Sequence, residues 1–199
     1  MSILFIQGSP VEPSRSAALL GFVANEIGRR GIDNSRLKLT DLPAQALLHA
    51  RFADPHIRIA SERVRGATAI VIATPVYKAA YSGLLKAFLD LLPQDALDGK
   101  VVLPLATAGS PNHALVLDYA LRPVLQSMSP SLVLPGVHAT DATLARTEGG
   151  GYVLSDDIID RLTRACDRLV YEYRALHERR PPADTPADPV PFDQVRCSI

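Results

Sequence analysis

The sequence is poor in cysteine and has no tryptophan. Its two cysteines are Cys166, in a helical pattern, and Cys197, in a polar segment. A disulfide framework or a cysteine-based metal site needs more cysteines at closer spacing. We therefore predict no disulfide and no metal site, and this cysteine usage fits the reducing cytoplasm.

An excess of either charge is also absent. Lys plus Arg and Asp plus Glu both number 21 among the 199 residues, so the formal net charge is +0. Such a chain has no overall basic field to attract nucleic acid and no acidic field to attract a basic partner. We predict no nucleic-acid partner and expect recognition to depend on local charges.

Long apolar runs are missing. No segment approaches the roughly 18 consecutive apolar residues of a membrane span. The first residues, MSILFIQGSP, lack the basic region and the length of a signal peptide. We predict no membrane partner, and a composition of 47% hydrophobic residues suits one α/β domain with a sizeable core.

The first loop lacks both common nucleotide motifs. It follows a buried-strand pattern at Ile3 to Ile6 and precedes a helical pattern from Ser16, yet contains neither G-x-G-x-x-G nor G-x-x-x-x-G-K-S/T. It offers hydroxyls at Ser9, Ser14 and Ser16 and a cation at Arg15. A helix amino-terminus with such neighbours suits one phosphate monoester, as in flavin mononucleotide (FMN). Serine is common at helix amino-termini, so this loop taken alone more often indicates that Ser14 simply caps the helix.

The central stretch presents a second loop at the same edge. Ala69 to Ile72 form an apolar, β-branched run typical of a strand buried on both faces. We predict a loop at Thr74 to Lys78, followed by a helix that Ser82 caps and Pro93 ends. The loop therefore lies where open α/β sheets bind ligands.

The other predicted elements complete an alternating α/β pattern. They are a strand at 36–39, an irregular segment at 44–54, a helix begun by Asp54 and Pro55, a strand at 101–106 ending in a loop at 107–111, a strand at 132–137, and a helix from Ser155 with Ile159 on its buried face. We predict a flavodoxin-like three-layer sandwich with a five-stranded parallel sheet in the order 2-1-3-4-5. The domain spans 1–178, and the proline-rich segment 179–199 is expected to be a disordered tail.

One helix is difficult to place on a single face. Around Tyr119 its sequence is LVLDYALRP, with Pro123 inside the pattern. A one-residue insertion that forms a π-bulge would absorb the misfit, and such bulges gather at functional sites. An ordinary aromatic in a proline-kinked helix explains the same sequence.

Four segments resemble a known family. They are GSPVEPSRS, ATPVYKAAYSGLLKAFLDLLP, GKVVLPLATAGS and HALVLDYALRPVL. Together they resemble the NADPH-dependent FMN reductases, most of all the flavin reductases of two-component alkanesulfonate monooxygenase systems. The likeness covers roughly residues 1 to 175. Two departures are Val11, where the family often has arginine, and Ala108, where it usually has glycine; Arg15 then remains to pair with the phosphate.

The resemblance implies hydride transfer from a reduced nicotinamide, NADPH or NADH, to FMN, in which the cofactors carry the chemistry and no catalytic residue is obligatory. It implies flavin contacts from three groups of residues: Ser9, Ser14, Arg15 and Ser16 at the phosphate; Pro75, Val76, Tyr77 and Lys78 at the ribityl chain and ring; Thr107, Ala108, Gly109 and Ser110 on the other side.

The resemblance also implies partners. FMN would be an exchangeable substrate, passed in reduced form to a flavin-dependent monooxygenase, and the chain would be a homodimer or homotetramer with Tyr119 at the interface near the ring. Three alternatives remain open from the residues. They are a quinone or azo reductase that retains its flavin, a flavodoxin-type electron carrier, and a structural or interaction domain.

Overall fold

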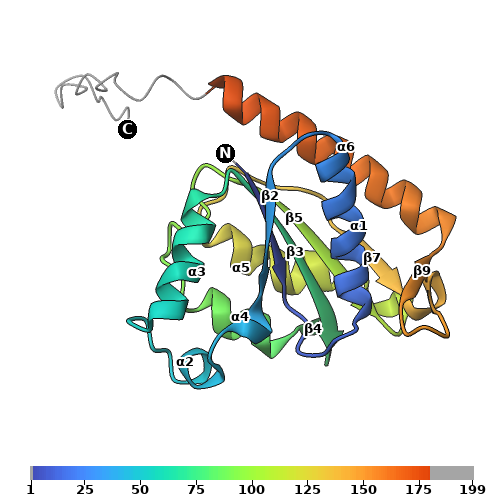
Figure 1. The fold of residues 1–199 in the computed structure, drawn as a ribbon, viewed down its shortest axis with the longest axis horizontal. Helices are drawn as coiled ribbons and strands as arrows, with labels where there is room; N and C mark the ends of the chain where they lie inside the picture. Colours follow the sequence, from blue (N-terminus) through green and yellow to red (C-terminus); the bar gives the residue numbers. More distant parts are fainter. Residues whose placement is uncertain (1, 180–199) are drawn as a thin grey trace, which may run out of the picture.

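A parallel sheet forms the centre of the computed structural model, which describes residues 2–179 (Figure 1). Its strand order is β2-β1-β3-β5-β6, with β7 also paired to β5. The bounds are β1 Ile3–Gln7, β2 Asn34–Lys38, β3 Ala69–Tyr77, β5 Val101–Ala108, β6 Leu132–Val133 and β7 Val137–Thr140. Counted along the chain, with β6 and β7 as two pieces of the fifth strand, this is the predicted order 2-1-3-4-5.

Helices cover both faces of the sheet (Figure 1). Because successive strand side chains point to opposite faces, Ile3 and Phe5 pack with one helix layer whereas Leu4 and Ile6 pack with the other. The first layer holds α1 Arg15–Arg29 and α6 Asp156–Arg179; the second holds α2 Ala44–Leu48, α3 Pro55–Gly66, α4 Gly83–Leu89, the π-helix η3 Leu117–Leu121 and α5 Arg122–Gln126. Two separate apolar clusters therefore stabilise one sheet.

The fifth strand is interrupted at Gly136. A Cβ atom there would lie 2.7 Å from the Pro104 carbonyl oxygen and 2.7 Å from a methyl carbon of Leu117. Only glycine fits between β5 and η3 at this point. The interruption lets β7 resume pairing with β5 as far as Thr140, opposite Ala108.

Three predictions about helices are wrong in detail. The segment 44–54, predicted to be irregular, contains α2, which forms because Ala46 and Leu47 are buried against the core. The helix expected to run to Pro93 ends at Leu89. On α6 the first buried residue is Ile158, and Ile159 is only half-buried.

The loop predicted at Thr74–Lys78 is largely strand. β3 continues to Tyr77 and turns back through β4, Ala80–Tyr81, as an antiparallel hairpin. The two turn residues, Lys78 and Ala79, have φ angles of 49° and 61°. Two consecutive left-handed residues are typical of a type I′ turn, whose twist matches that of its strands.

A second small hairpin was not predicted. β8 Leu144–Arg146 and β9 Tyr152–Leu154 pair antiparallel between β7 and α6. The segment 180–199, which holds most of the predicted tail, lies outside the described residues. The domain boundary at 178 therefore stays a prediction.

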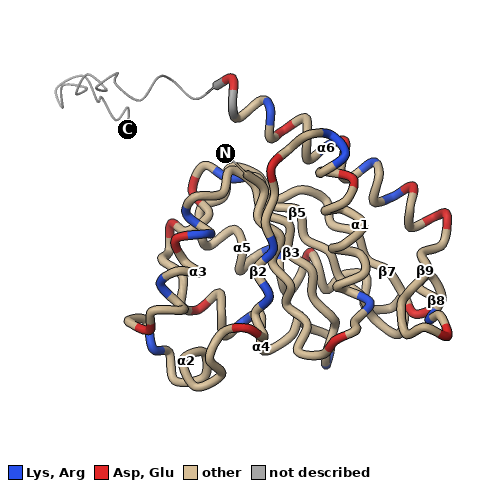
Figure 2. The backbone as a smooth tube through the Cα atoms, viewed as in Figure 1, with Lys and Arg blue, Asp and Glu red and all other residues tan. Residues whose placement is uncertain are grey.

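Acidic and basic residues are interspersed along the described chain, and both kinds occur along the length of α6 (Figure 2). None of the helices within residues 2–179 has the length and apolar character that a membrane span needs.

Candidate functional site

The carboxyl ends of β1, β3 and β5 lie side by side. Gln7 is in register with Ala73, and Pro75 with Thr107. The loop after β1 passes so close to β3 that a Cβ on Gly8 would lie 3.1 Å from the Ala73 carbonyl oxygen. The prediction that three strand ends meet at one sheet edge is therefore confirmed.

Buried hydroxyl groups join the first loop to the β3–β4 hairpin. The Ser82 hydroxyl donates to the Gly8 carbonyl oxygen at 2.5 Å and accepts from the Leu85 N–H at the start of α4. The Ser82 N–H donates in turn to the Thr74 hydroxyl at 3.0 Å. Ser82 thus caps α4 as predicted, and Thr74 serves the scaffold rather than facing a ligand.

The three serines expected at a phosphate serve the loop and the helix cap. The Ser9 hydroxyl donates to the Val11 carbonyl oxygen at 2.9 Å, and Ser9 is fully buried. The Ser14 hydroxyl accepts from the Ala17 N–H at 3.2 Å and so caps α1, while the buried Ser16 hydroxyl lies 3.4 Å from it. In this structure the hydroxyls shape the loop and do not project from it.

The amino-terminus of α1 nevertheless suits a phosphate. Its described hydrogen bonds satisfy the N–H groups of Ala17 and Ala18. Those of Arg15 and Ser16 have no acceptor among residues 2–179. Free N–H groups on the positive end of a 15-residue helix are the donors that a phosphate monoester needs, so the loop fits FMN.

Arg15 faces a residue that the sequence analysis missed. Its Nη2 lies 3.2 Å from Oδ2 of Asp141, which follows β7, and its guanidinium lies 5.6 Å from the centre of the Tyr152 ring on β9. Asp141 and Tyr152 both lie far from Arg15 in the sequence. Asp141 follows the end of the fifth strand, so the rule that indicated the other loops would have found it, had the strand not been expected to end at Val137.

The remaining predicted ring contacts differ in exposure. Tyr77 and Lys78 are exposed at the tip of the β3–β4 hairpin, and Pro75 and Val76 are half-buried at its base. Thr107 and Ala108 are buried as the last residues of β5, where a loop was predicted, whereas Gly109 is exposed. The half-buried Ser110 accepts a hydrogen bond from the Asn112 N–H at 3.2 Å.

Tyr119 lies at the centre of a π-helix, the first of the two interpretations that the sequence left open. Its side chain is 79% exposed, while Leu117 and Leu121 of the same turn are buried. The insertion therefore places Tyr119 outside the chain's own core. Its expected role at a subunit interface stays a prediction.

A polar chain supports the base of the first loop. The Gln7 side-chain amide donates to Glu12 at 2.5 Å, and the ammonium of Lys38 lies 3.0 Å from the same carboxylate oxygen. The hydrogen bond from Lys38, followed by the one from Gln7, holds the pKa of Glu12 below its usual value. Glu12 thus stays ionised and joins the ends of β1 and β2.

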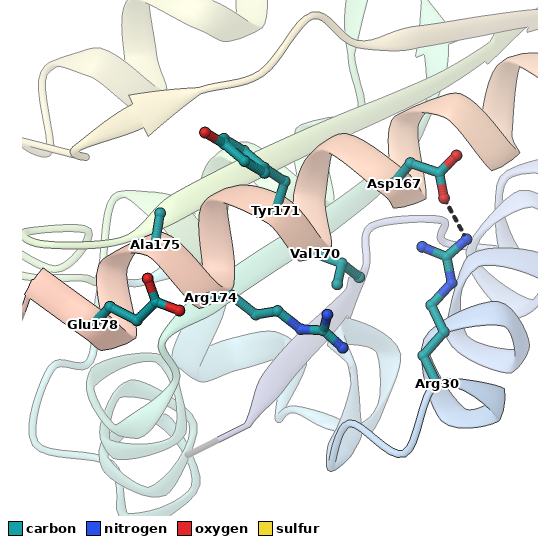
Figure 3. A pocket seen from close by; sticks show the side chains of 7 residues that line it. All are labelled: Arg30, Asp167, Val170, Tyr171, Arg174, Ala175 and Glu178. Atoms are coloured by element: carbon teal, nitrogen blue, oxygen red, sulfur yellow. Dashed lines mark hydrogen bonds and ion pairs between the residues drawn. The ribbon is translucent and has the colours of Figure 1, made fainter.

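The cleft drawn in Figure 3 lies elsewhere. It has a volume of about 580 Å³ and is lined by Arg30 and by α6 residues that include Tyr171 and Arg174. Arg30 follows the carboxyl end of α1, so this cleft is at the sheet edge opposite the α1 amino-terminus. It plays no part in the site described above.

A parallel sheet of this order, with helices on both faces, defines a flavodoxin-like α/β protein. A flavodoxin of Streptococcus pneumoniae TIGR4 has the same fold, with a TM-score of 0.61 at 14% identity over 86% of this chain and 99% of that chain. The model of the family "NADPH-dependent FMN reductase" matches residues 1–143, and the chain belongs to this family.

Two relatives support the assignment. An "FMN reductase (NADPH)" of Pseudomonas putida is 44% identical over 149 residues, which are 75% of this chain and 76% of that protein. The apo crystal structure of an NADH:FMN oxidoreductase matches with a TM-score of 0.77 and 38% identity, over 86% of this chain and 89% of that chain. The chain is therefore an oxidoreductase that uses NADPH and FMN.

Proposed function

We propose that FMN is an exchangeable substrate of this reductase and that reduced FMN passes to a monooxygenase of the alkanesulfonate type. One observation carries the proposal: the side chains around the phosphate loop have other partners. Ser9 and Ser14 bond within the chain, and Arg15 pairs with Asp141. Such a loop offers a phosphate mainly backbone N–H groups. These form weaker hydrogen bonds than charged side chains do, so we expect the binding of FMN to be reversible.

The proposed site keeps the predicted residues. Ser9, Ser14, Arg15 and Ser16 shape or contact the phosphate end; Pro75, Val76, Tyr77 and Lys78 flank the ring; Thr107, Ala108, Gly109 and Ser110 close its other side. Bound FMN supplies the hydride-accepting ring. The chain binds and orients the two substrates, and the exposed Tyr77 ring offers an apolar surface beside them.

We also assign Tyr119 to a subunit interface near the ring. A tyrosine that a π-helix directs out of the core, with 79% of its surface exposed, suits burial against a second copy in a dimer or tetramer. Leu115, one turn earlier, is exposed as well and would share that contact.

Steady-state kinetics test the proposal. We expect the purified protein to be nearly colourless, NADPH oxidation to require added FMN, and initial-rate plots to intersect, as in a ternary complex. Stoichiometric FMN that survives dialysis, with parallel-line kinetics toward a quinone, would instead establish a flavin-retaining quinone reductase. Transfer is tested by coupling the reductase to an alkanesulfonate monooxygenase and measuring sulfite release.

A further inference from the structure

The partner of Arg15 suggests how flavin affinity is set. The Arg15 guanidinium lies 3.2 Å from the Asp141 carboxylate and over the Tyr152 ring. Arg15 is the first residue of α1, directly beside the two free N–H groups that suit a phosphate. The Arg15 side chain therefore pairs with a carboxylate in this structure and also lies beside a site that suits an anionic ligand.

Asp141 is held at the ligand edge by its own surroundings. It begins a short 3-10 turn after β7, and reciprocal hydrogen bonds between Thr140 and Thr143 cap that turn. Its Oδ2 atom lies 3.9 Å from the position of a Cβ built on Gly109, in the loop after β5. The carboxylate thus stands between the first and third loops of the site.

From this geometry we infer that Asp141 is a specificity residue, which competes with the flavin phosphate for Arg15 and so keeps FMN exchangeable. The inference rests on the proposed phosphate site. Arg15 leaves Asp141 when the dianion arrives, because a phosphate offers more charge and more acceptor oxygens than a carboxylate. Breaking the existing ion pair subtracts from the affinity for FMN, but not for riboflavin, which has no phosphate.

The competition has a bounded size. The two side chains are 36% and 46% exposed, so solvent screens the ion pair. We expect Asp141→Asn to lower the dissociation constant of FMN by about 3- to 10-fold, in line with one partly exposed charge interaction. The dissociation constant of riboflavin should stay within about 2-fold, because a neutral flavin does not need Arg15.

The test is a set of flavin titrations, monitored by fluorescence, with FMN and riboflavin at one ionic strength. The variants are Asp141→Asn, Arg15→Ala and the double variant. Asp157→Asn is the matched control, because it removes the same charge from an exposed ion pair, with Arg161 on α6. Circular dichroism checks that each variant is folded. We expect tighter FMN binding in Asp141→Asn only, and no such gain when Arg15 is already alanine.

Each other outcome decides the question. Unchanged or weaker FMN binding in Asp141→Asn would show that the carboxylate orients Arg15 instead of competing for it. An equal gain in the Arg15→Ala background would show simple repulsion and also overturn the inference. If Arg15→Ala weakens FMN and riboflavin equally, the phosphate site itself is misplaced. Selective loss of FMN in Arg15→Ala, together with no gain in Asp141→Asn, overturns the competition alone.

Discussion

At the scale of single residues, Ser82 has the largest structural role of the hydroxyls at the ligand edge. It caps α4 and holds the Gly8 carbonyl oxygen. Ser82→Ala removes the cap and leaves a buried carbonyl without its partner, so we expect a loss of about 2–3 kcal/mol in the free energy of unfolding. Urea denaturation monitored by circular dichroism measures it.

Ser127→Ala is the control for Ser82. The Ser127 hydroxyl also donates to a backbone carbonyl, that of Val124, but at an exposed position. We expect this change to stay within about 0.5 kcal/mol of the original protein. Similar losses for the two variants would mean that the link between Gly8 and α4 contributes little.

Cys166 is a residue whose reactive thiol is made inert by burial. It is fully buried, and burial raises the pKa of its thiol to about 12. Since only the thiolate reacts with iodoacetamide, we expect no labelling of Cys166 in the native protein at pH 8 and rapid labelling in urea. A Cys197→Ser variant isolates the signal; equally fast labelling with and without urea would contradict the expectation.

The same pKa has a consequence for stability. A thiol whose pKa is higher folded than unfolded stabilises the native state fully below its unfolded value of 9.0. As the pH rises from there toward about 12, the unfolded chain loses the proton first and the contribution declines. Cys166→Ala should therefore reduce the alkaline loss of stability over that range.

At the scale of elements, the break in the fifth strand depends on one glycine. Gly136→Ala forces a Cβ against the Pro104 carbonyl oxygen and Leu117, both at 2.7 Å. Because backbone lies on one side, the site cannot relax cheaply, and we expect a loss of about 1–3 kcal/mol. Thermal unfolding measures it.

Gly66→Ala provides the matched comparison for Gly136. Gly66 is the last residue of α3, and a Cβ there meets nothing within 4 Å. Alanine is the better helix former, so we expect a gain of about 0.5–1 kcal/mol. Opposite signs for the two variants would separate steric restriction from the general cost of replacing glycine.

The sequence predicted those elements whose signals are local. Apolar β-branched runs located the parallel strands, and Asp54 with Pro55 located the start of α3. The β3–β4 hairpin was not predicted because its turn residues are Lys78 and Ala79, and not the Asn-Gly pair that usually indicates positive φ angles. The helix α2 was not predicted because its five residues are too few to show a helical period, and its stability comes from tertiary burial.

In the candidate site, too, only the features with local sequence signals were predictable. The three loops follow from strand ends and small residues, and membership of the family establishes that the chain uses FMN and NADPH. The pairing of Arg15 with Asp141 could not be predicted, because it depends on how β7 and the β8–β9 hairpin fold back onto α1. The spacing of residues along the chain does not indicate such a tertiary contact.

At the scale of the whole molecule, the proposed role of Tyr119 would connect flavin exchange to assembly. Deleting Tyr119 should restore a regular helix, tighten FMN retention and lower transfer of reduced flavin to the oxygenase. Tyr119→Ala keeps the extra residue and removes only the ring, so it separates the two effects. Sedimentation gives the oligomeric mass and dialysis gives the FMN affinity; a folded deletion variant unchanged in both would reject the role of Tyr119.

The long sequence separation between Arg15 and its partners also affects the order of events during synthesis. The first loop emerges from the ribosome early, whereas Asp141 and Tyr152 are translated much later. At roughly 5–20 residues per second, the delay is on the order of ten seconds. The ion pair between Arg15 and Asp141 can therefore form only after the chain has been synthesised beyond Asp141, so this part of the fold is completed late.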